Sequence, residues 1–292
     1  VTINTASATG TFASANVGTG ITVTVAGIAK AGLDNANYSI TQPTTTANIT
    51  ARGLTVTASN QTKTYGDSVL GTALFTSTGL QNSETIGSAT LTTNSALSAS
   101  SNYIAGSSTI TPSAAIGGTF TITNYSVTYA TGTLTVNAKA LTVSGVTANA
   151  KVYDGLTTAT AQLNLGTAAF VGVVGIDAVT INTASATGTF ASANVGTGIT
   201  VTVAGIAKAG VDNANYTITQ PTTTANITAR ALTVTASNQT KTYGDSTLGT
   251  SAFTSSGLQN GETIGSATLT SNSAISNSDN YIAGTSTIIP SA

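Results

Sequence analysis

LTVTASNQTKTYGD, Leu54 to Asp67, returns letter for letter at Leu232 to Asp245 and has a relative, LTVSGVTANAKVYDG, at Leu141 to Gly155. In each copy apolar residues alternate with threonine at the start, which is the period-two pattern of a half-buried strand. The closing Gly and Asp favour a turn. The copies begin 141 − 54 = 87 and 232 − 141 = 91 residues apart. One strand-and-turn element therefore recurs in each module of about 90 residues.

A longer repeat contains this one. Val1–Ala114 aligns with Val179–Ala292 at a constant offset of 178, with 14 differences, so that 114 − 14 = 100 positions are identical. Two module types therefore alternate along the chain. The predicted order is the C-terminal part of one type (1–52), a complete module of the other type (53–138), a complete module of the first type (139–230) and the N-terminal part of the other (231–292).

The alternation of apolar residues with threonine predicts an all-β fold of tandem small domains, β-grasp-like or immunoglobulin-like. Linkers of two to four residues, as at 137–140, predict beads on a semi-rigid rod. Within Phe120–Tyr129 the apolar residues change from even to odd positions, which predicts buried Phe120 and Ile122 and a bend near Asn124. Residues 68–75 are expected to hold at most one short turn of helix.

Composition excludes several classes of function. The chain has no Cys or His, eight Lys and Arg, and nine Asp and Glu, with a net charge of −1. It therefore lacks the basic stripe of a nucleic-acid binder and the ligands of common zinc, haem and iron–sulfur sites. Catalytic Ser-His-Asp and Cys-His arrangements are also absent. No apolar run approaches the ~18 residues of a membrane span, so this segment is expected not to insert into a membrane.

The motifs KTYGD and KVYDG have two interpretations. They could form a Lys-Tyr-Asp acid/base site, or a strand end whose tyrosine packs inward and whose Gly and Asp form the next turn. The order of Gly and Asp changes between the two module types, and the motif recurs once per module, which favours the structural interpretation. The predicted turn and core residues are Lys63, Tyr65, Gly66, Asp67, Lys151, Tyr153, Asp154, Gly155, Lys241, Tyr243, Gly244 and Asp245.

A second recurrent motif, DNANY, places Tyr38 and Tyr216 after short Asx-rich turns. A turn whose tyrosine enters the core is the favoured interpretation. A weak calcium site at Asp34 or Asp212 is the alternative, although calcium prefers six to eight oxygen ligands, and no cofactor is expected otherwise.

Two further alternatives concern threonine and lysine. Threonine-rich strands could form an ice-binding face, but a regular array of hydroxyls needs a solenoid. A module of about 90 residues is much longer than one coil of a solenoid. Intramolecular isopeptide bonds would use Lys63, Lys151 or Lys241 with a neighbouring Asn.

The motifs resemble two known repeat families. KVYDG with GTFASANVGTGITVTV and GVDNANYTIT resembles the YDG repeat, and LTVTASNQTKTYGDS with GLQNGETIG and SNYIAG resembles the MBG repeat of the YGX type. The resemblance covers essentially the whole chain. It implies a segment of a large bacterial surface or secreted protein, such as a haemagglutinin-like adhesin, and it brings no catalytic residues.

The expected function is therefore a structural repeat of an extracellular stalk, fibre or biofilm matrix, and not an enzyme. Because identical side surfaces repeat along such a chain, self-association along or between fibres is expected. The alternative is a module that binds glycans or another host ligand.

Overall fold

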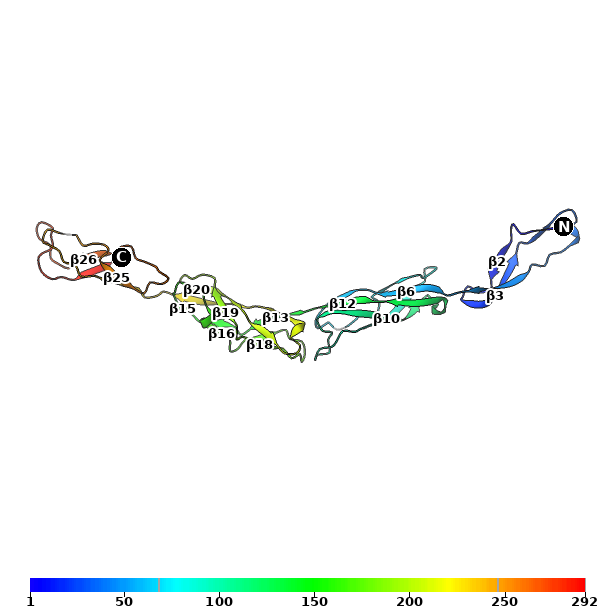
Figure 1. Ribbon diagram of the computed structural model, residues 1–292, viewed down its shortest axis with the longest axis horizontal. Coiled ribbons are helices and arrows are strands. Elements are labelled where there is room, and N and C mark those ends of the chain that lie inside the picture. Colours follow the sequence, from blue (N-terminus) through cyan, green and yellow to red (C-terminus); the bar gives the residue numbers. More distant parts are fainter. Residues whose placement is uncertain (68, 246, 292) are drawn as a thin grey trace. The chain divides into compact units, whose positions relative to one another are not determined.

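The computed structural model describes residues 1–67, 69–245 and 247–291 and has the all-β fold predicted from the sequence (Figure 1). Its only helices, within these residues, are four 3₁₀ turns. The chain divides into two compact units. The first comprises 1–139, 174–178 and 214–217, and the second comprises 140–173, 179–213 and 218–291.

The complete module 53–138 is a small β-sandwich. Its strands form two sheets, in the orders β7-β12-β10-β9 and β11-β6-β8. The pairs β6/β11 and β7/β12 are parallel, so the first and last segments of the module each contribute to both sheets. The bounds are β6 (Arg52–Ala58), β7 (Gln61–Thr64), β8 (Phe75–Thr78), β9 (Ile86–Thr93), β10 (Gly106–Gly118), η2 (Ile122–Asn124), β11 (Tyr125–Ala130) and β12 (Gly132–Asn137).

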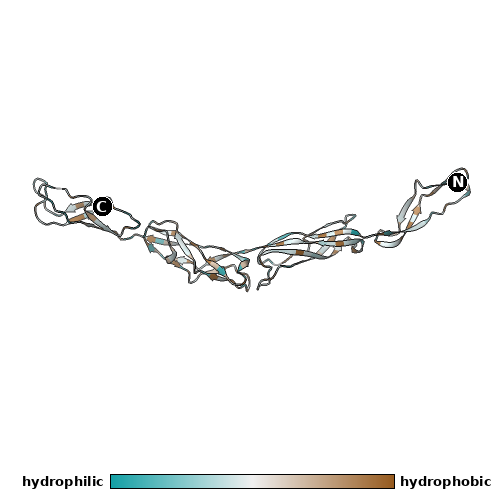
Figure 2. Ribbon diagram, viewed as in Figure 1, coloured by the Kyte–Doolittle hydropathy of each residue, from teal (hydrophilic) through white to brown (hydrophobic). Residues whose placement is uncertain are grey.

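The core of this module lies between its two sheets. Leu54 and Val56 of β6 pack with Ala89 of β9 and Ala115 of β10. Polar and apolar residues alternate along the strands (Figure 2), because only one face of each sheet is buried. The prediction of alternating, half-buried strands is thereby explained by the two-sheet arrangement.

One of two local expectations needs correction. The bend near Asn124 is the 3₁₀ turn η2, and Ile122 within it is 49% exposed and not buried, because the turn carries this side chain away from the sandwich. In the segment 68–75, Ser68 lies outside the described residues. Residues 69–75 contain a turn and the first residue of β8, but no helix.

The complete module 139–230 repeats the same plan with more strands. Its main sheets have the orders β15-β23-β20-β19 and β17-β13-β22, with β15 and β23 parallel. The bounds are β13 (Lys139–Ser144), β14 (Thr147–Ala148), β15 (Lys151–Val152), η3 (Thr160–Gln162), β16 (Leu163–Asn164), β17 (Ala169–Val171), β18 (Thr180–Asn182), β19 (Thr187–Phe190), β20 (Gly196–Ala204), β21 (Ala207–Ala209), η4 (Asn213–Asn215), β22 (Tyr216–Thr219) and β23 (Thr222–Thr228).

The partial modules keep the local pairings of their complete counterparts. In 1–52, β3 pairs with β2 and β5, and in 231–292 the strands form the pairs β24/β25 and β26/β27. The bounds are β1 (Thr2–Asn4), β2 (Thr9–Phe12), β3 (Gly18–Ala26), β4 (Ala29–Ala31), η1 (Asn35–Asn37), β5 (Thr44–Ile49), β24 (Thr233–Ala236), β25 (Phe253–Ser256), β26 (Thr268–Ser271) and β27 (Ile288–Ser291).

Side chains that are buried in the complete modules are exposed in the partial ones. Leu54 is 1% exposed, whereas its repeat counterpart Leu232 is 49% exposed. Phe190 is 1% exposed, whereas its counterpart Phe12 is 43% exposed. Identical local sequence thus yields a closed core only where the remaining strands of the module accompany it.

Candidate functional site

A buried carboxylate lies at the point where the two complete modules meet within the first compact unit. Asp177, from the segment 174–178, is 8% exposed and lies between the hydroxyls of Tyr65 and Tyr216. Tyr216 donates to Asp177 Oδ2 over 2.6 Å, and Tyr65 donates to the same oxygen. The backbone N–H of Ser100 donates to Oδ1 over 3.1 Å. We call Asp177 with Tyr65 and Tyr216 the carboxylate clasp.

The tyrosines of the clasp come from the two recurrent motifs. Tyr65 of KTYGD follows β7 and is 2% exposed, and Tyr216 of DNANY opens β22 and is 1% exposed. Their rings form an edge-to-face pair with centroids 5.2 Å apart and an interplanar angle of 73°, an arrangement that aromatic quadrupoles favour. The structure therefore brings together two motifs that the sequence places 151 residues apart, 216 − 65 = 151.

The turn after Tyr65 fits the adjoining segment closely. The Asp67 N–H donates to the Thr64 carbonyl over 3.1 Å, and Gly66 has φ of 105°, which favours glycine. A Cβ at Gly66 would lie 3.4 Å from Val174. The turn thus presents Tyr65 while keeping its own backbone against the segment 174–178.

Further hydrogen bonds hold the same two segments on the module 53–138. Ser100 Oγ donates to the Val174 carbonyl over 2.9 Å and accepts from the Ile176 N–H over 2.9 Å. The Asn215 side chain, 3% exposed, accepts from the Ala105 N–H over 2.8 Å. The clasp is therefore the centre of a network in which both contributed segments are fixed by directional contacts.

Burial and hydrogen bonding act in opposite directions on the clasp carboxylate. Burial alone would raise the pKa of Asp177, but hydrogen bonds from Ser100, Tyr216 and Tyr65 outweigh it and hold the pKa below its ordinary value. Burial, followed by the hydrogen bond to Asp177, raises the pKa of Tyr216 well above its ordinary value. The site therefore stabilises a charged carboxylate between neutral phenols.

These shifts predict a stability window in pH. Because the folded pKa of Asp177 is lowered, its contribution is present above its unfolded pKa of about 4 and is lost as pH falls through the folded value. Because the folded pKa of Tyr216 is raised, its contribution is present below about pH 10 and is lost at higher pH. Hydrogen exchange of residues 98–105 followed over pH, after correction for intrinsic exchange, should show protection falling at both limits. Loss of protection at neutral pH would contradict the assignment.

The clasp carboxylate has a counterpart in the modules 53–138 and 231–292. Asp177 ends the sequence GVVGID at 172–177, and Glu84 and Glu262 end GLQNSE at 79–84 and GLQNGE at 257–262. The same backbone hydrogen bond closes each of the three turns. The carboxylate residue donates its N–H to the carbonyl three positions earlier, at Val174, Gln81 and Gln259.

Asp177 accepts hydrogen bonds from two tyrosines, whereas Glu84 and Glu262 each accept from one. Tyr125, from the end of the module 53–138, donates to Glu84 of its own module, as Tyr216 does to Asp177. Tyr153 of KVYDG donates to Glu262 of the following module over 2.5 Å, as Tyr65 does to Asp177. These hydrogen bonds raise the pKa of both Tyr125 and Tyr153 and lower the pKa of Glu262.

KVYDG differs from KTYGD in the contacts that its charged residues make. Lys151 is 7% exposed, and its Nζ donates to Asp154 Oδ1 over 2.7 Å and to the carbonyls of Leu156 and Thr158. Its ammonium group lies 5.3 Å from the centroid of the Phe190 ring. The hydrogen bond from Lys151 lowers the pKa of Asp154. The aspartate of KVYDG therefore pairs with the lysine of its own motif.

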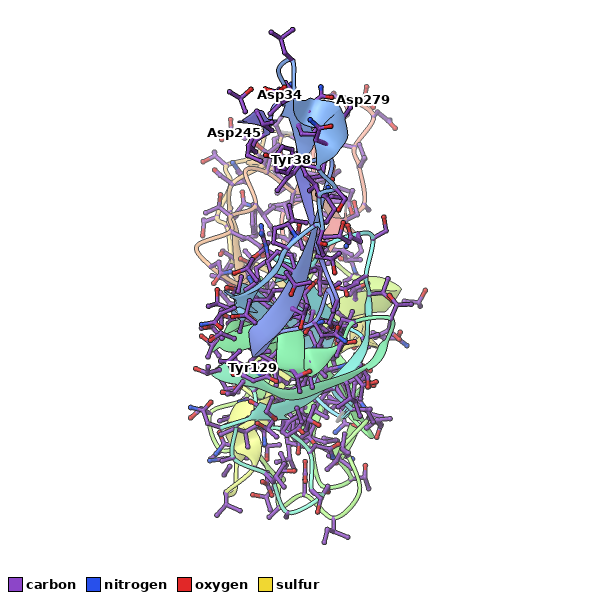
Figure 3. The ribbon with its side chains drawn as sticks, turned by 90° about the vertical axis from the view of Figure 1, so that its right-hand side faces the viewer. Asp34, Tyr38, Tyr129, Asp245 and Asp279 are labelled. Carbon is purple, nitrogen blue, oxygen red and sulfur yellow. The ribbon has the colours of Figure 1, made fainter. Side chains whose placement is uncertain are left out.

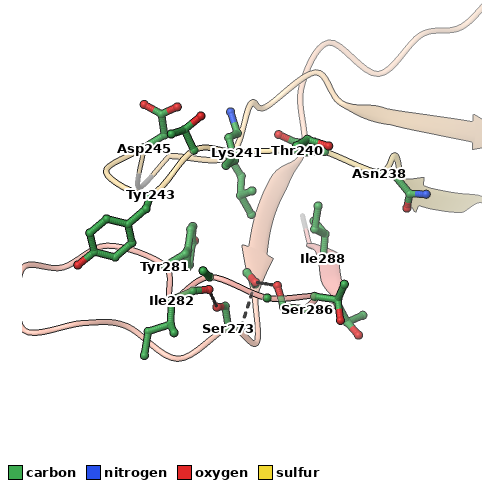
Figure 4. Close-up of a pocket in the computed structure, with 18 of the residues that line it drawn as sticks. Asn238, Thr240, Lys241, Tyr243, Asp245, Ser273, Tyr281, Ile282, Ser286 and Ile288 are labelled. Atoms are coloured by element: carbon green, nitrogen blue, oxygen red, sulfur yellow. Dashed lines mark hydrogen bonds between the residues drawn. The ribbon is translucent and has the colours of Figure 1, made fainter.

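The other predicted motif residues lie outside these contacts. Tyr38, labelled in Figure 3, and Tyr243, labelled in Figure 4, are each 61% exposed and so are not core residues in this chain. Their counterparts Tyr216 and Tyr65 are buried because Asp177 and the surrounding segments cover them. Lys63 is half-buried, and Lys241, Gly244 and Asp245 are exposed; Gly155 has φ of 73° and its carbonyl accepts from Asn260 Nδ2 over 2.7 Å.

The calcium and isopeptide alternatives gain no support from geometry. Across residues 1–67, 69–245 and 247–291, no three acidic side chains gather into a group that could hold a metal ion. Asp34 is exposed and Asp212 is 6% exposed, on different modules. The side-chain acceptor on Lys151 Nζ is the Asp154 carboxylate, where an isopeptide bond of the expected kind needs an Asn.

Two family models match consecutive parts of the chain. The YDG domain matches residues 1–47 and 137–225, and the MBG domain of the YGX type matches residues 54–135 and 232–291. The chain belongs to the class of proteins built from tandem YDG and MBG domains. The search of curated proteins found no match.

The two families also indicate the general role of the chain. YDG and MBG domains are typical of the repeats of bacterial surface adhesins, which are extracellular, and they are structural or adhesion domains and not enzyme families. No helix in the described part of the chain has the length and apolar character needed to cross a membrane. The carboxylate clasp joins an MBG domain, 54–135, to segments of the YDG domain that follows it.

Proposed function

We propose that the chain is a structural repeat segment of an extracellular bacterial stalk or fibre, in which carboxylate clasps fix consecutive domains against each other. The observation that carries this proposal is the position of Asp177. It is a buried charge whose stabilising hydrogen bonds come from two domains at once, through Tyr65 and Tyr216. Separation of the domains would remove donors from a buried carboxylate, which is costly.

The alternation of domains supports the same mechanical role. In each of the two domain types the K-x-Y tyrosine reaches a carboxylate of the next domain, Tyr65 to Asp177 and Tyr153 to Glu262. A joint made of directional hydrogen bonds resists both bending and rotation more than a flexible linker does. If every joint is fixed in this way, a chain with more repeats forms a longer stalk.

Small-angle scattering of the full chain, with calcium and with chelator, tests this proposal. We expect an elongated particle whose scattering is unchanged by chelator, because the joints use protein groups alone. A compact or flexible particle, or one that stiffens only with calcium, would refute it. Scattering that changes with concentration would in addition support the proposed self-association along or between fibres.

The tyrosine of KTYGD offers a matched pair of variants for the joint. Tyr65→Phe removes one donor from the Asp177 carboxylate, whereas Tyr243→Phe changes the same motif where the ring is 61% exposed. We expect Tyr65→Phe to destabilise the joint by about 1–3 kcal/mol, because a buried charged acceptor loses a partner, and Tyr243→Phe to have almost no effect. Hydrogen exchange of the segment 174–178 gives the measurement, and equal effects of the two variants would refute this role of Tyr65.

A further inference from the structure

The MBG domain 54–135 carries two hydrogen-bond donors at one end of its four-stranded sheet. The Tyr65 N–H donates to the carbonyl of Asn137, where β12 ends, over 2.8 Å. Gly106, the first residue of β10, pairs with Val136 at the same end of β12. The hydroxyl of Tyr65 and the N–H of Ala105, which precedes Gly106, therefore lie at one end of the sheet. We call these two groups the donor pair of the domain.

The YDG domain 137–225 has the same donor pair. The Tyr153 N–H donates to the carbonyl of Thr228, where β23 ends, over 2.9 Å, and Gly196, the first residue of β20, pairs with the same strand. β20 holds the place in its sheet that β10 holds in the MBG sheet. The residue before β20 is Val195, and its counterpart in the first YDG domain is Val17, 195 − 178 = 17. The donor pair of a YDG domain is thus the K-x-Y hydroxyl and this valine N–H.

Each domain type also has an Asn-Tyr pair in which the asparagine ends a 3₁₀ turn and the tyrosine opens a strand. The pairs are Asn124-Tyr125 at η2 and β11, and Asn215-Tyr216 at η4 and β22. Each tyrosine hydroxyl donates to the carboxylate of its own domain and accepts from the backbone N–H three residues before that carboxylate, at Gln81 over 3.1 Å and at Val174 over 2.9 Å. The Asn-Tyr pair is therefore held on the carboxylate turn in the same way in both domain types.

The asparagine of each pair accepts a hydrogen bond from the donor pair of the preceding domain. Asn215 Oδ1 accepts from the Ala105 N–H over 2.8 Å, and Asn124 Oδ1 accepts from the Val17 N–H over 2.9 Å. The carboxylate turn beside the pair accepts the other donor, the K-x-Y tyrosine, as described above. Both kinds of hydrogen bond occur where an MBG domain precedes a YDG domain and where it follows one.

We propose that the asparagine and the carboxylate of each domain form a docking site for the donor pair of the preceding domain, and that this site accepts either domain type. The groups that it recognises are a phenol hydroxyl and a backbone N–H, which both domain types present at the same end of the sheet. The residue that donates its N–H is alanine in one joint and valine in the other, so its side chain does not decide recognition. YDG and MBG domains are then exchangeable neighbours. Asn124 and Asn215 are positioning residues of the joints.

Asn124→Ala in the full chain tests the docking site. It removes the acceptor of the Val17 N–H, so amide exchange at Val17, resolved by NMR, should accelerate about fivefold or more. Asn124→Asp keeps an acceptor oxygen at the same position and should restore most of the protection. Asn48→Ala is the matched control, because Asn48 Oδ1 accepts from the Gly20 N–H over 2.8 Å within one domain. It should accelerate exchange at Gly20 and leave Val17 unchanged.

A double substitution tests whether the docking site accepts either domain type. Asn16→Ile with Val17→Ala gives the YDG domain the two residues that precede β10 in the MBG domain, Ile104 and Ala105. Exchange of the amide at position 17 should stay within about threefold of the parent, because the only recorded bond that is lost joins exposed side-chain groups, Asn124 Nδ2 and Asn16 Oδ1. The protection that remains should still depend on Asn124.

The inference rests on the proposed function, since a docking site has a role only where consecutive domains are held together, but the two can fail separately. Exchange at Val17 that ignores Asn124→Ala, or that loses its protection in the double variant, would overturn the docking site. Fast exchange of residues 174–178 in the parent chain would instead refute the clasp of the proposed function. The variants at positions 16, 17 and 124 leave that clasp unchanged, so the two results are read independently.

Discussion

Replacement of Asp177 by alanine is expected to open the joint between the first MBG domain and the YDG domain that follows. The change leaves the hydroxyls of Tyr65 and Tyr216 and the N–H of Ser100 without their shared acceptor. Each hydrogen bond to the charged carboxylate contributes about 1.5–3 kcal/mol, the three losses are not additive, and the Tyr65 hydroxyl keeps Ser98 Oγ as a partner, so a total of about 3–5 kcal/mol is expected. Local hydrogen exchange at 98–105 and 174–178 is the measurement of choice, because a multidomain chain does not unfold in two states.

Asp67→Ala is the matched control for this prediction. Asp67 stands in the turn next to Tyr65, and its side chain is exposed. Its substitution should change the free energy of local opening, measured by hydrogen exchange, by no more than about 0.5 kcal/mol, as for an ordinary surface site. If Asp177→Ala behaved like Asp67→Ala, the buried carboxylate would have no part in holding the segment 174–178.

Leu54→Ala is expected to destabilise the first MBG domain by about 2–5 kcal/mol, since a fully buried leucine loses its transfer free energy and leaves a cavity between the two sheets. Leu232→Ala, the same substitution at the repeat counterpart, should cost about 1 kcal/mol or less, because Leu232 is 49% exposed. Hydrogen exchange resolved to β6 and β24 separates the two effects. Equal losses would show that the second MBG domain has a closed core in solution.

The sequence predicted the parts of the fold that depend on local pattern. The alternation in LTVT and the repeat offset of 178 were sufficient for an all-β chain of alternating domains, because strand burial has a period of two whichever residues lie opposite. The tyrosines of KTYGD and DNANY were recognised as structural by their recurrence. Their partners were not predicted, since Tyr65 and Asp177 are 112 residues apart and no local pattern joins them.

Asp177 was missed although the sequence carried a signal for it. Aligned with GLQNSE and GLQNGE, the segment GVVGID shows a glycine followed five residues later by a carboxylate in all three turns. In a chain with only nine acidic residues, a carboxylate that recurs at the same position of three turns is informative. The prediction that Ile122 is buried was wrong for a different reason. Ile122 lies in a 3₁₀ turn, where the period of two of a strand does not hold.

The most direct test of the clasp is a distance measurement within the first compact unit. The chain has no cysteine, so spin labels can be placed at Thr92→Cys and Ile176→Cys, both exposed, without other changes. We expect a single narrow distance distribution by double electron–electron resonance, which broadens when Asp177→Ala is added and is unaffected by Asp67→Ala. A broad distribution in the labelled parent, or one that Asp177→Ala leaves narrow, would contradict the claim that the carboxylate clasp holds the YDG segment on the MBG domain.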